Sequence, residues 1–523
     1  WFAQITMDIL VSAIVGDLVS RSATFLISKY FREQHPGIDE ILQRLQRVVL
    51  RIDTVVEEAE GRLITNQGML RQLKVLRQEM YRGHYVIDAL RFQAAHDEEE
   101  ASHSSVAAAP PRSGTGPAKR LRFSGGNGGG GSSDREAAAM SVFGASRSIR
   151  GGLQRVVEAL EDTMDHAGMK EFLSFLASYP RVLRQPYCAY LLLENCMFGR
   201  QSERQRVLDF LLRPSSSSCT SLSVLPIVGR LRVGKSTLVE HVCRDESVRD
   251  HFSTIIFFPE GSVNKDQAAI GGFQVRHRQN SAPPSRNRML LAIVEIAGGD
   301  IDEGTWRRLK ASVTGMAPSG GGSKIIVTSR SERVMNLGTT GSALRLHRVP
   351  PDAHWYFFKS LAFGSTDPDE HPHMAAMAME IASEQIQCLM KAHIIAGLLR
   401  DNLDARFWRG ILERVRAYRR KMQHDKRPDD VSSREYQPPI TSWRLGGRSC
   451  KYFMICKHHQ SESSSEQVPK IRLQDVLLGR GGRLPRGEFQ VLALRSCIPP
   501  YYNYNVTCMM PAPQPAVVRK KRA

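Results

Sequence analysis

The sequence of 523 residues has few cysteines and no long apolar run, and each lack excludes a class of protein. Its nine cysteines include no C-x-x-C pair and no even spacing, so we expect neither a disulfide framework nor a zinc site. This cysteine usage fits a reducing intracellular compartment. No stretch of about 18 apolar residues occurs, so no transmembrane helix is expected. Residues 9–19 are apolar but contain Asp17 and lack a basic leader, which argues against a signal peptide.

Acidic residues are fewer than basic ones, 53 against 72, which gives a formal net charge of +19. Such an excess favours acidic partners without specifying which. The basic residues are dispersed, and no helix-turn-helix or zinc-finger pattern accompanies them, so nucleic-acid binding is not predicted. Two short basic runs, at 119–122 and 519–522, are interpreted as solvated charge, with nuclear import as the alternative.

The residues before about position 95 predict a helical bundle, which we place at 7–95 with Met7 as the expected start. Apolar side chains recur at alternating steps of three and four along two stretches, which is typical of heptad seams. The first seam consists of Ile38, Ile41, Leu45, Val48, Ile52 and Val55, and the second of Met69, Leu73, Leu76, Met80, Gly83, Ile87 and Leu90. Residues 61–68 supply the turn between them, and 8–31 predict an earlier apolar helix.

The composition changes after the bundle. Residues 96–147 are rich in Gly, Ser and Ala and predict a disordered linker, because they cannot bury enough apolar area to offset the entropy of ordering. Residues 148–180 then predict an amphipathic helix that completes the bundle. Its apolar positions run from Leu153 to Met164, followed by Phe172, Leu173, Phe175 and Leu176.

The segment 229–237 (G-R-L-R-V-G-K-S-T) matches the phosphate-binding pattern G-x-x-x-x-G-K-[ST] in full. An apolar run at 222–228 precedes it and a helical pattern follows, as the motif requires. Backbone N–H groups in such a loop, at the start of a helix, can surround a phosphate. Lys235 would reach the β- and γ-phosphates, and Ser236 would hold Mg²⁺. The predicted nucleotide-binding residues of the loop are Gly229, Val233, Gly234, Lys235, Ser236 and Thr237.

Strands that alternate with helices are expected around this loop. Apolar runs at 254–258, 289–296 and 324–328 predict further buried strands. We therefore predict a P-loop domain with a doubly wound parallel sheet at 195–345. A helical domain is expected at 346–420. Residues 421–523 are expected to be irregular, with short apolar pieces that suggest β or extended structure and a basic tail.

Several motifs, in this order along the chain, resemble the plant coiled-coil NB-ARC disease-resistance proteins. They are V-I-D at 86–88, M-F-G-R at 197–200 with Glu203, the phosphate loop, H-V-C at 241–243, S-K-I-I-V-T-S-R at 323–330, and W-Y-F-F at 355–358 with A-F-G at 362–364. The resemblance covers residues 7–415. It implies a multidomain α + α/β fold, ADP or ATP as ligand with Mg²⁺, and a role for Arg330 as the sensor arginine that reads the γ-phosphate.

The sequence departs from the family pattern at the nucleotide site. Leu231 and Arg232 replace glycines of the phosphate loop, and Glu295-Ile296 replaces two aspartates after the strand at 289–296. Glu295 could still coordinate Mg²⁺, whereas Ile296 cannot polarise water. Slow or absent hydrolysis is expected, with no catalytic residue.

Other family motifs are altered or missing. Residues 387–390 (Q-C-L-M) stand where the family has the adenine-contacting Gly-Leu-Pro-Leu, and His84-Tyr85 replace acidic residues of the EDVID motif. Met-His-Asp and leucine-rich repeats are not found. The chain is thus identified as similar to a divergent, grass-type member without the repeats.

Three functions remain open at this point. The first is an ADP/ATP-binding switch or regulator in plant innate immunity; the second is a scaffold or decoy with a vestigial nucleotide site; the third is an active P-loop NTPase. The expected partners are other proteins that contact the N-terminal bundle, through self-association or pairing with full-length resistance receptors. The expected location is cytoplasmic, with the plasma-membrane periphery or the nucleus as alternatives.

Overall fold

The computed structural model describes residues 38–62, 64–104, 149–180, 196–213, 222–259, 272–279, 289–296, 301–316, 322–339, 343–385, 387–424, 440–443, 452–462, 468–478, 485 and 487–510. The chain divides into two units. The first contains Trp1–Tyr187, Pro351–Lys359 and Ser365–Glu380, and the second contains Cys188–Pro350, Ser360–Gly364 and Ile381–Ala523. The predicted helix at 8–31 lies outside the described residues.

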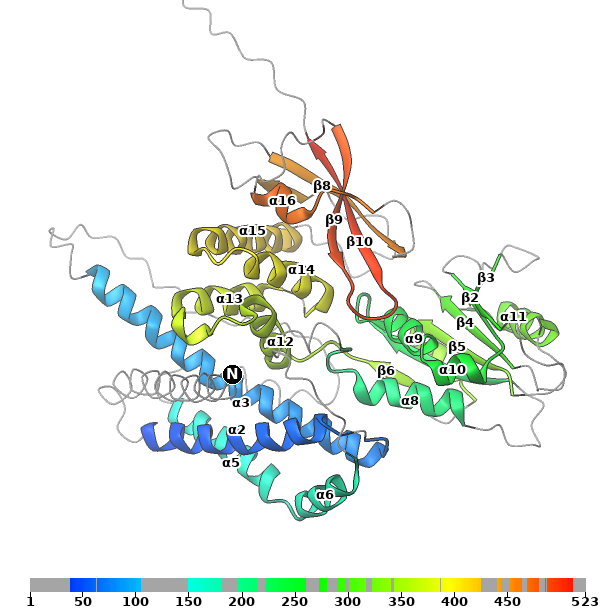
Figure 1. The fold of residues 1–523 in the computed structure, drawn as a ribbon, viewed down its shortest axis with the longest axis horizontal. Coiled ribbons are helices and arrows are strands. Elements are labelled where there is room, and N and C mark those ends of the chain that lie inside the picture. The colour runs from blue at the N-terminus through cyan, green and yellow to red at the C-terminus, as the bar shows by residue number, and fades with distance from the viewer. Residues whose placement is uncertain are drawn as a thin grey trace, which may run out of the picture. The chain divides into compact units, whose positions relative to one another are not determined.

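The first unit begins with a helical bundle (Figure 1). Its helices are α2 (Ile38–Glu60), α3 (Gln67–Ser104), α5 (Ile149–Asp165) and α6 (Ala167–Ser178). Every member of the second seam is buried, as are Ile41, Leu45, Val48 and Ile52 of the first. Helices α2 and α3 approach closely at Gly83, where an added Cβ would lie 2.3 Å from Cγ2 of Val49. The seams are therefore packed core.

Two parts of the bundle differ from the sequence-based expectation. Helix α3 continues to Ser104, past the predicted start of the linker at 96, because the sequence there is rich in the helix formers Ala and Glu. The rest of the predicted linker, from 105, lies outside the described residues. On α6, Phe172 and Leu176 are buried, whereas Leu173 is 41% and Phe175 60% exposed.

The second unit contains a six-stranded sheet in the order β3-β2-β4-β5-β1-β6. Its strands are β1 (Ser223–Gly229), β2 (Thr254–Phe258), β3 (Gln274–Arg278), β4 (Leu290–Ile296), β5 (Lys324–Ser329) and β6 (Leu344–Leu346). All neighbours are parallel except β2 and β3, which are antiparallel. The predicted parallel sheet is confirmed. The edge strand β3 was not predicted, because its sequence Q-V-R-H-R is polar and mostly exposed.

Alternation along the strands gives the sheet two apolar faces. One face, which includes Leu291 and Ile293 of β4, packs against α8 (Gln201–Leu212), α9 (Lys235–Cys243) and α10 (Glu246–His251). The other face, which includes Ala292 and Val294, packs against α11 (Glu303–Met316) and the 3-10 helix η1 (Glu332–Leu337). Strands β1, β2, β4 and β5 are therefore buried on both sides, which explains their nearly continuous apolar sequences.

The predicted helical region is also present. It consists of α12 (Pro351–Phe363), the 3-10 helix η2 (Pro368–Glu370), α13 (Pro372–Glu384), α14 (Leu389–Arg400) and α15 (Ala405–His424). Among the described residues, no helix is both long enough and apolar enough to cross a membrane.

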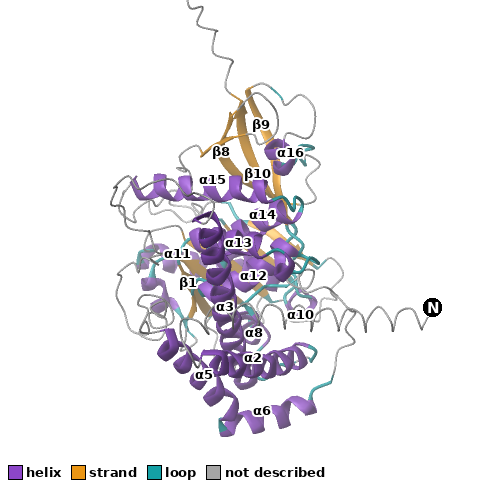
Figure 2. Cartoon of the chain, turned by 90° about the vertical axis from the view of Figure 1, so that its left-hand side faces the viewer, coloured by secondary structure: helices purple, strands orange, loops and turns teal. Residues whose placement is uncertain are grey.

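The C-terminal region is more regular than the sequence predicted. The expected β or extended structure forms a four-stranded antiparallel sheet in the order β7-β8-β10-β9. Its elements are β7 (Ile440–Trp443), β8 (Tyr452–Glu462), α16 (Leu473–Leu478), β9 (Gly487–Arg495) and β10 (Tyr502–Met510). Helix α16 lies beside β9 (Figure 2). The apolar pieces are short, so only their pairing in the sheet makes them regular.

Candidate functional site

The phosphate-loop sequence lies between the end of β1 and the start of α9. Gly229 is the last residue of β1, and a Cβ there would lie 2.5 Å from the carbonyl oxygen of Leu346 on the neighbouring strand β6. Gly234 is the N-cap of α9 and has a φ of 95°, a left-handed conformation that favours glycine. Both glycines of the motif are thus required by the backbone.

The functional side chains of the loop are already placed by polar contacts. Lys235 Nζ donates to the carbonyl oxygens of Gly229, at 2.7 Å, and of Arg230, at 3.0 Å. The Ser236 hydroxyl donates to the carboxylate of Glu295 at the end of β4. The ammonium group therefore lies over the loop, and the hydroxyl and carboxylate are adjacent.

Strand alternation explains why Glu295 and not Ile296 contacts Ser236. Glu295 follows Leu291 and Ile293 at steps of two, so it lies on the face that α9 covers. Ile296 packs with the opposite apolar cluster, against the face that α11 covers. One carboxylate therefore reaches the loop from β4, and position 296 belongs to the other side of the sheet.

The remaining predicted residues lie around the same edge. Val233 is buried, and Thr237 is half-buried in the first turn of α9. Arg330 directly follows β5, whose last residue Ser329 pairs with Val228 of β1. The carboxyl ends of parallel strands lie at one edge of a sheet, so Arg330 shares that edge with the loop.

Arg200 supports the loop, a role that the sequence analysis did not assign. Its guanidinium donates to the carbonyl oxygens of Val233, at 3.1 Å, and of His347, at 2.6 Å. Burial lowers the pKa of Arg200, and the charge of Glu203 opposes this shift. The motif M-F-G-R at 197–200 contained the signal, since its arginine follows a glycine with a φ of 67° and directly precedes α8.

Leu231 and Arg232 stand where the family has glycines in this loop, and the backbone is left-handed at one of the two positions. Arg232 has a φ of 62°, in the left-handed region, while Leu231 is 45% exposed. Burial lowers the pKa of Lys391 on α14, and the charge of Arg232 lowers it further. Sequence reasoning did not find Lys391, although it directly follows the segment 387–390. A cation of the loop therefore acts electrostatically on a cation of α14.

These residues fit a magnesium–phosphate group. The N-terminus of α9 directs backbone N–H groups outward beside a glycine that has no side chain to cap them. An ammonium group lies over the loop, and the pair formed by Ser236 and Glu295 offers the hard oxygen ligands that Mg²⁺ prefers.

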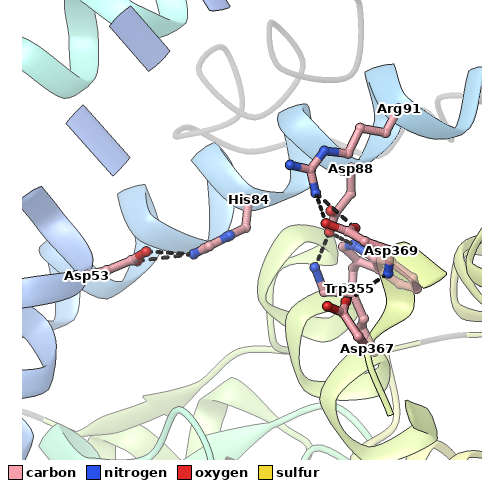
Figure 3. Close-up of polar contacts among 8 residues, drawn as sticks. Asp53, His84, Asp88, Arg91, Trp355, Asp367 and Asp369 are labelled. Carbon is pink, nitrogen blue, oxygen red and sulfur yellow. Dashed lines mark hydrogen bonds and ion pairs between the residues drawn. The ribbon is translucent and has the colours of Figure 1, made fainter. Parts of the chain in front are cut away.

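A second polar cluster lies in the first unit, where α3 meets the start of α12 (Figure 3). Oδ2 of the buried Asp88 accepts a hydrogen bond from Trp355 Nε1, at 2.9 Å, and pairs with the Lys359 ammonium. Arg91 donates to both carboxylate oxygens of Asp369, at 3.0 Å. The V-I-D and W-Y-F-F motifs of the sequence analysis therefore contact one another.

Aromatic side chains surround this polar cluster. The ring centroids of Tyr81 and Tyr356 are 4.8 Å apart, and Phe92 meets Trp355 edge to face at 6.1 Å. His84, at a position where the family has an acidic residue, contacts Asp53 of α2 at 3.1 Å. Its polar contact is therefore within the bundle, while its ring lies 5.7 Å from that of Tyr356 on α12.

Comparisons with known proteins find similarity to plant proteins. The Rx N-terminal domain family matches residues 14–120, which include all of α2 and α3. Disease resistance protein RGA2 of Solanum bulbocastanum is 22% identical over 423 residues, 78% of this chain and 38% of the relative. The chain is thus similar to plant disease-resistance proteins over much of its length.

Other relatives give the same result. RPP13-like protein 1 of Arabidopsis thaliana is 23% identical over 413 residues, 74% of this chain and 36% of its own length. RGA4 of Solanum bulbocastanum is 22% identical over 270 residues, 49% of this chain and 27% of its own length. This chain therefore spans well under half the length of these relatives. The similarity to RGA2 is longer than the Rx N-terminal match and so extends beyond that domain.

Proposed function

We propose that this chain is an ADP- or ATP-binding regulator in plant defence that hydrolyses nucleotide slowly or not at all. The observation that carries the proposal is the arrangement of Lys235, Ser236 and Glu295 at the N-terminus of α9. A charged ammonium, a hydroxyl and a carboxylate converge beside uncapped backbone N–H groups. The relatives named above, which are disease-resistance proteins, support the biological setting.

Each residue has a defined part in holding the nucleotide. Gly229 and Gly234 let the backbone approach the phosphates, and Lys235 supplies a charge-assisted contact to the β- and γ-phosphates. Ser236 and Glu295 would hold Mg²⁺, which neutralises phosphate charge when bound. The family resemblance gives Arg330 the part of reading the γ-phosphate.

Slow hydrolysis follows from the end of β4. Attack on the γ-phosphate needs a group that orients or activates water, and Ile296 has no polar atom in its side chain. Its packing with the opposite apolar cluster supports a structural role for this position. The site therefore favours binding over turnover, so the proposed regulator responds to which nucleotide is bound.

The test of this proposal is calorimetry of MgADP and MgATP binding to the full chain and to Lys235→Met. Loss of a charged hydrogen bond costs about 1.5–3 kcal/mol, so affinity should fall by about tenfold or more. The matched control is Lys170→Met, which removes an exposed lysine from α6 and should leave affinity unchanged. Equal affinities in Lys235→Met and the unmodified chain would reject the site, and absence of binding by the unmodified chain would favour the scaffold function.

We also propose that the N-terminal bundle contacts another protein or a second copy of the chain. The exposed Phe175 and Leu173 on α6 and Leu50 on α2 support this role, because they are apolar side chains outside the packed seams. Light scattering of Phe175→Glu against the unmodified chain would measure the change in self-association. If the unmodified chain and Phe175→Glu both have the mass of a monomer, the bundle does not mediate self-association.

A further inference from the structure

The loop between β9 and β10 touches the helix that carries the phosphate-binding residues (Figure 1). His241 Nδ1 lies 2.6 Å from the carbonyl oxygen of Pro499, and the Tyr502 hydroxyl donates to the carboxylate of Glu240. A carbonyl oxygen can only accept, so Nδ1 of His241 carries the proton. Glu240 and His241 belong to α9, less than two turns after Lys235 and Ser236.

Strands β9 and β10 and the loop between them form a β-hairpin, and this β9–β10 hairpin also reaches the start of α14. Tyr504 is close enough to both Glu240 and Cys388 for their charges to raise its pKa, after the larger effect of its burial. Cys388 is the N-cap of α14, and β9 packs near that helix. The hairpin therefore contacts α9 on one side and α14 on the other.

The helices that the hairpin contacts each carry a cation that interacts with the phosphate loop. Lys235 is the first residue of α9, and the pKa of Lys391 of α14 is lowered by burial and, to a smaller extent, by the charge of Arg232 in the loop. Lys391 and Arg232 repel one another, and an anion beside them would relieve this repulsion. The arrangement that the hairpin maintains is therefore one that an anionic ligand stabilises.

We propose that the β9–β10 hairpin is an internal clamp that joins α9 to α14 and raises the affinity of the phosphate loop for nucleotide. This inference rests on the proposed nucleotide-binding function. Because coupling between sites is reciprocal, a bound nucleotide strengthens docking of the hairpin to the same extent as docking strengthens nucleotide binding. The C-terminal sheet thereby reports on, and responds to, the state of the nucleotide site.

The test removes the contact from each side in the full chain. Tyr502→Phe deletes the hydroxyl and Glu240→Ala deletes the carboxylate that accepts from it, while Tyr179→Phe removes a phenol hydroxyl from the first unit as the matched control. Calorimetry with MgADP should give an affinity about fivefold lower or more in each hairpin variant, and no change in the control. The double variant should lose little more than either single variant, because all three lack the same contact.

Hydrogen exchange provides a second readout. MgADP should slow amide exchange in residues 502–510 of the unmodified chain, and this protection should be smaller in Tyr502→Phe. If the unmodified chain and Tyr502→Phe bind MgADP with equal affinity, the clamp is wrong and the proposed function stands. Failure of the unmodified chain to bind either nucleotide would overturn the proposed function and the clamp together.

Discussion

The carboxylate of Asp88 in the first unit faces the ammonium group of Lys359, whereas the ammonium group of Lys324 in the second unit donates to backbone carbonyls. The first arrangement cancels charge within the protein. The second satisfies the hydrogen bonds of the cation but leaves its net charge in place. Lys235 also donates to carbonyl oxygens near the phosphate loop, and Arg200 does so while it pairs with Glu203.

This difference matches what each region has to do. A contact that only joins helices is best neutralised, because an unpaired buried charge is costly. A loop that attracts phosphate needs cations that are oriented and still charged. We expect Lys235, at the loop, to attract a ligand, whereas Lys324, at the opposite end of β5 from the loop, serves structure.

The largest effect is expected from breaking the neutralised pair. Asp88→Ala leaves the Lys359 ammonium and the Trp355 N–H without their acceptor in a mostly buried cluster, and should lower the free energy of unfolding by about 3–5 kcal/mol. Urea denaturation of the full chain measures the change. Asp88→Asn keeps an oxygen for Trp355 and should lose less. If both variants are as stable as the unmodified chain, the pair does not hold the first unit together.

A smaller effect is expected at the carbonyl-bound cation. Lys324 Nζ donates to the carbonyl oxygens of Phe210, Leu211 and Arg213, at 2.8, 3.0 and 2.6 Å, at the C-terminal end of α8. Lys324→Met leaves these acceptors unsatisfied and should destabilise the second unit by about 1–3 kcal/mol, measured by urea denaturation. Lys170→Met serves as the exposed control, and a loss of equal size there would contradict the assignment.

The effect of Lys324 on the free energy of unfolding should depend on pH. Burial, with a contribution from the charge of Arg213, lowers the pKa of Lys324 to about 8, whereas an unfolded lysine has a pKa of about 10.4. Between these values the unfolded chain binds more protons, so the free energy of unfolding should rise as pH increases through this window. The difference between wild type and Lys324→Met should therefore grow from pH 7.5 to pH 10. A constant difference would show that Lys324 has an ordinary pKa.

The smallest effect is expected within the phosphate loop. Arg232→Gly relieves a left-handed backbone and should stabilise the second unit by about 0.5–1 kcal/mol, which thermal denaturation can detect. Leu231→Gly is the matched control, because it introduces a glycine at a neighbouring position whose φ is not positive. Among the described non-glycine residues, only Arg232 has a positive φ. Equal shifts in both variants would mean that backbone strain at Arg232 is not the cause.

Local patterns in the sequence determined most of the secondary structure. The heptad seams, the apolar strands and the glycine loop depend on fixed side-chain periods and on backbone conformations that few residues adopt. The predicted fold class is confirmed for this reason. The same patterns could not reveal the exposed strand β3 or the C-terminal sheet, whose short segments become ordered only by pairing.

Tertiary structure alone decided which side chains meet. The sequence named Lys235, Ser236 and Glu295, but the packing of α9 on one face of the sheet selected Glu295 and turned Ile296 away. Asp88 meets Trp355 across 267 positions, and Tyr502 meets Glu240 across 262. Such contacts depend on the path of the whole chain and not on any local period. Local sequence patterns therefore predict the helices and strands but not which of them come into contact.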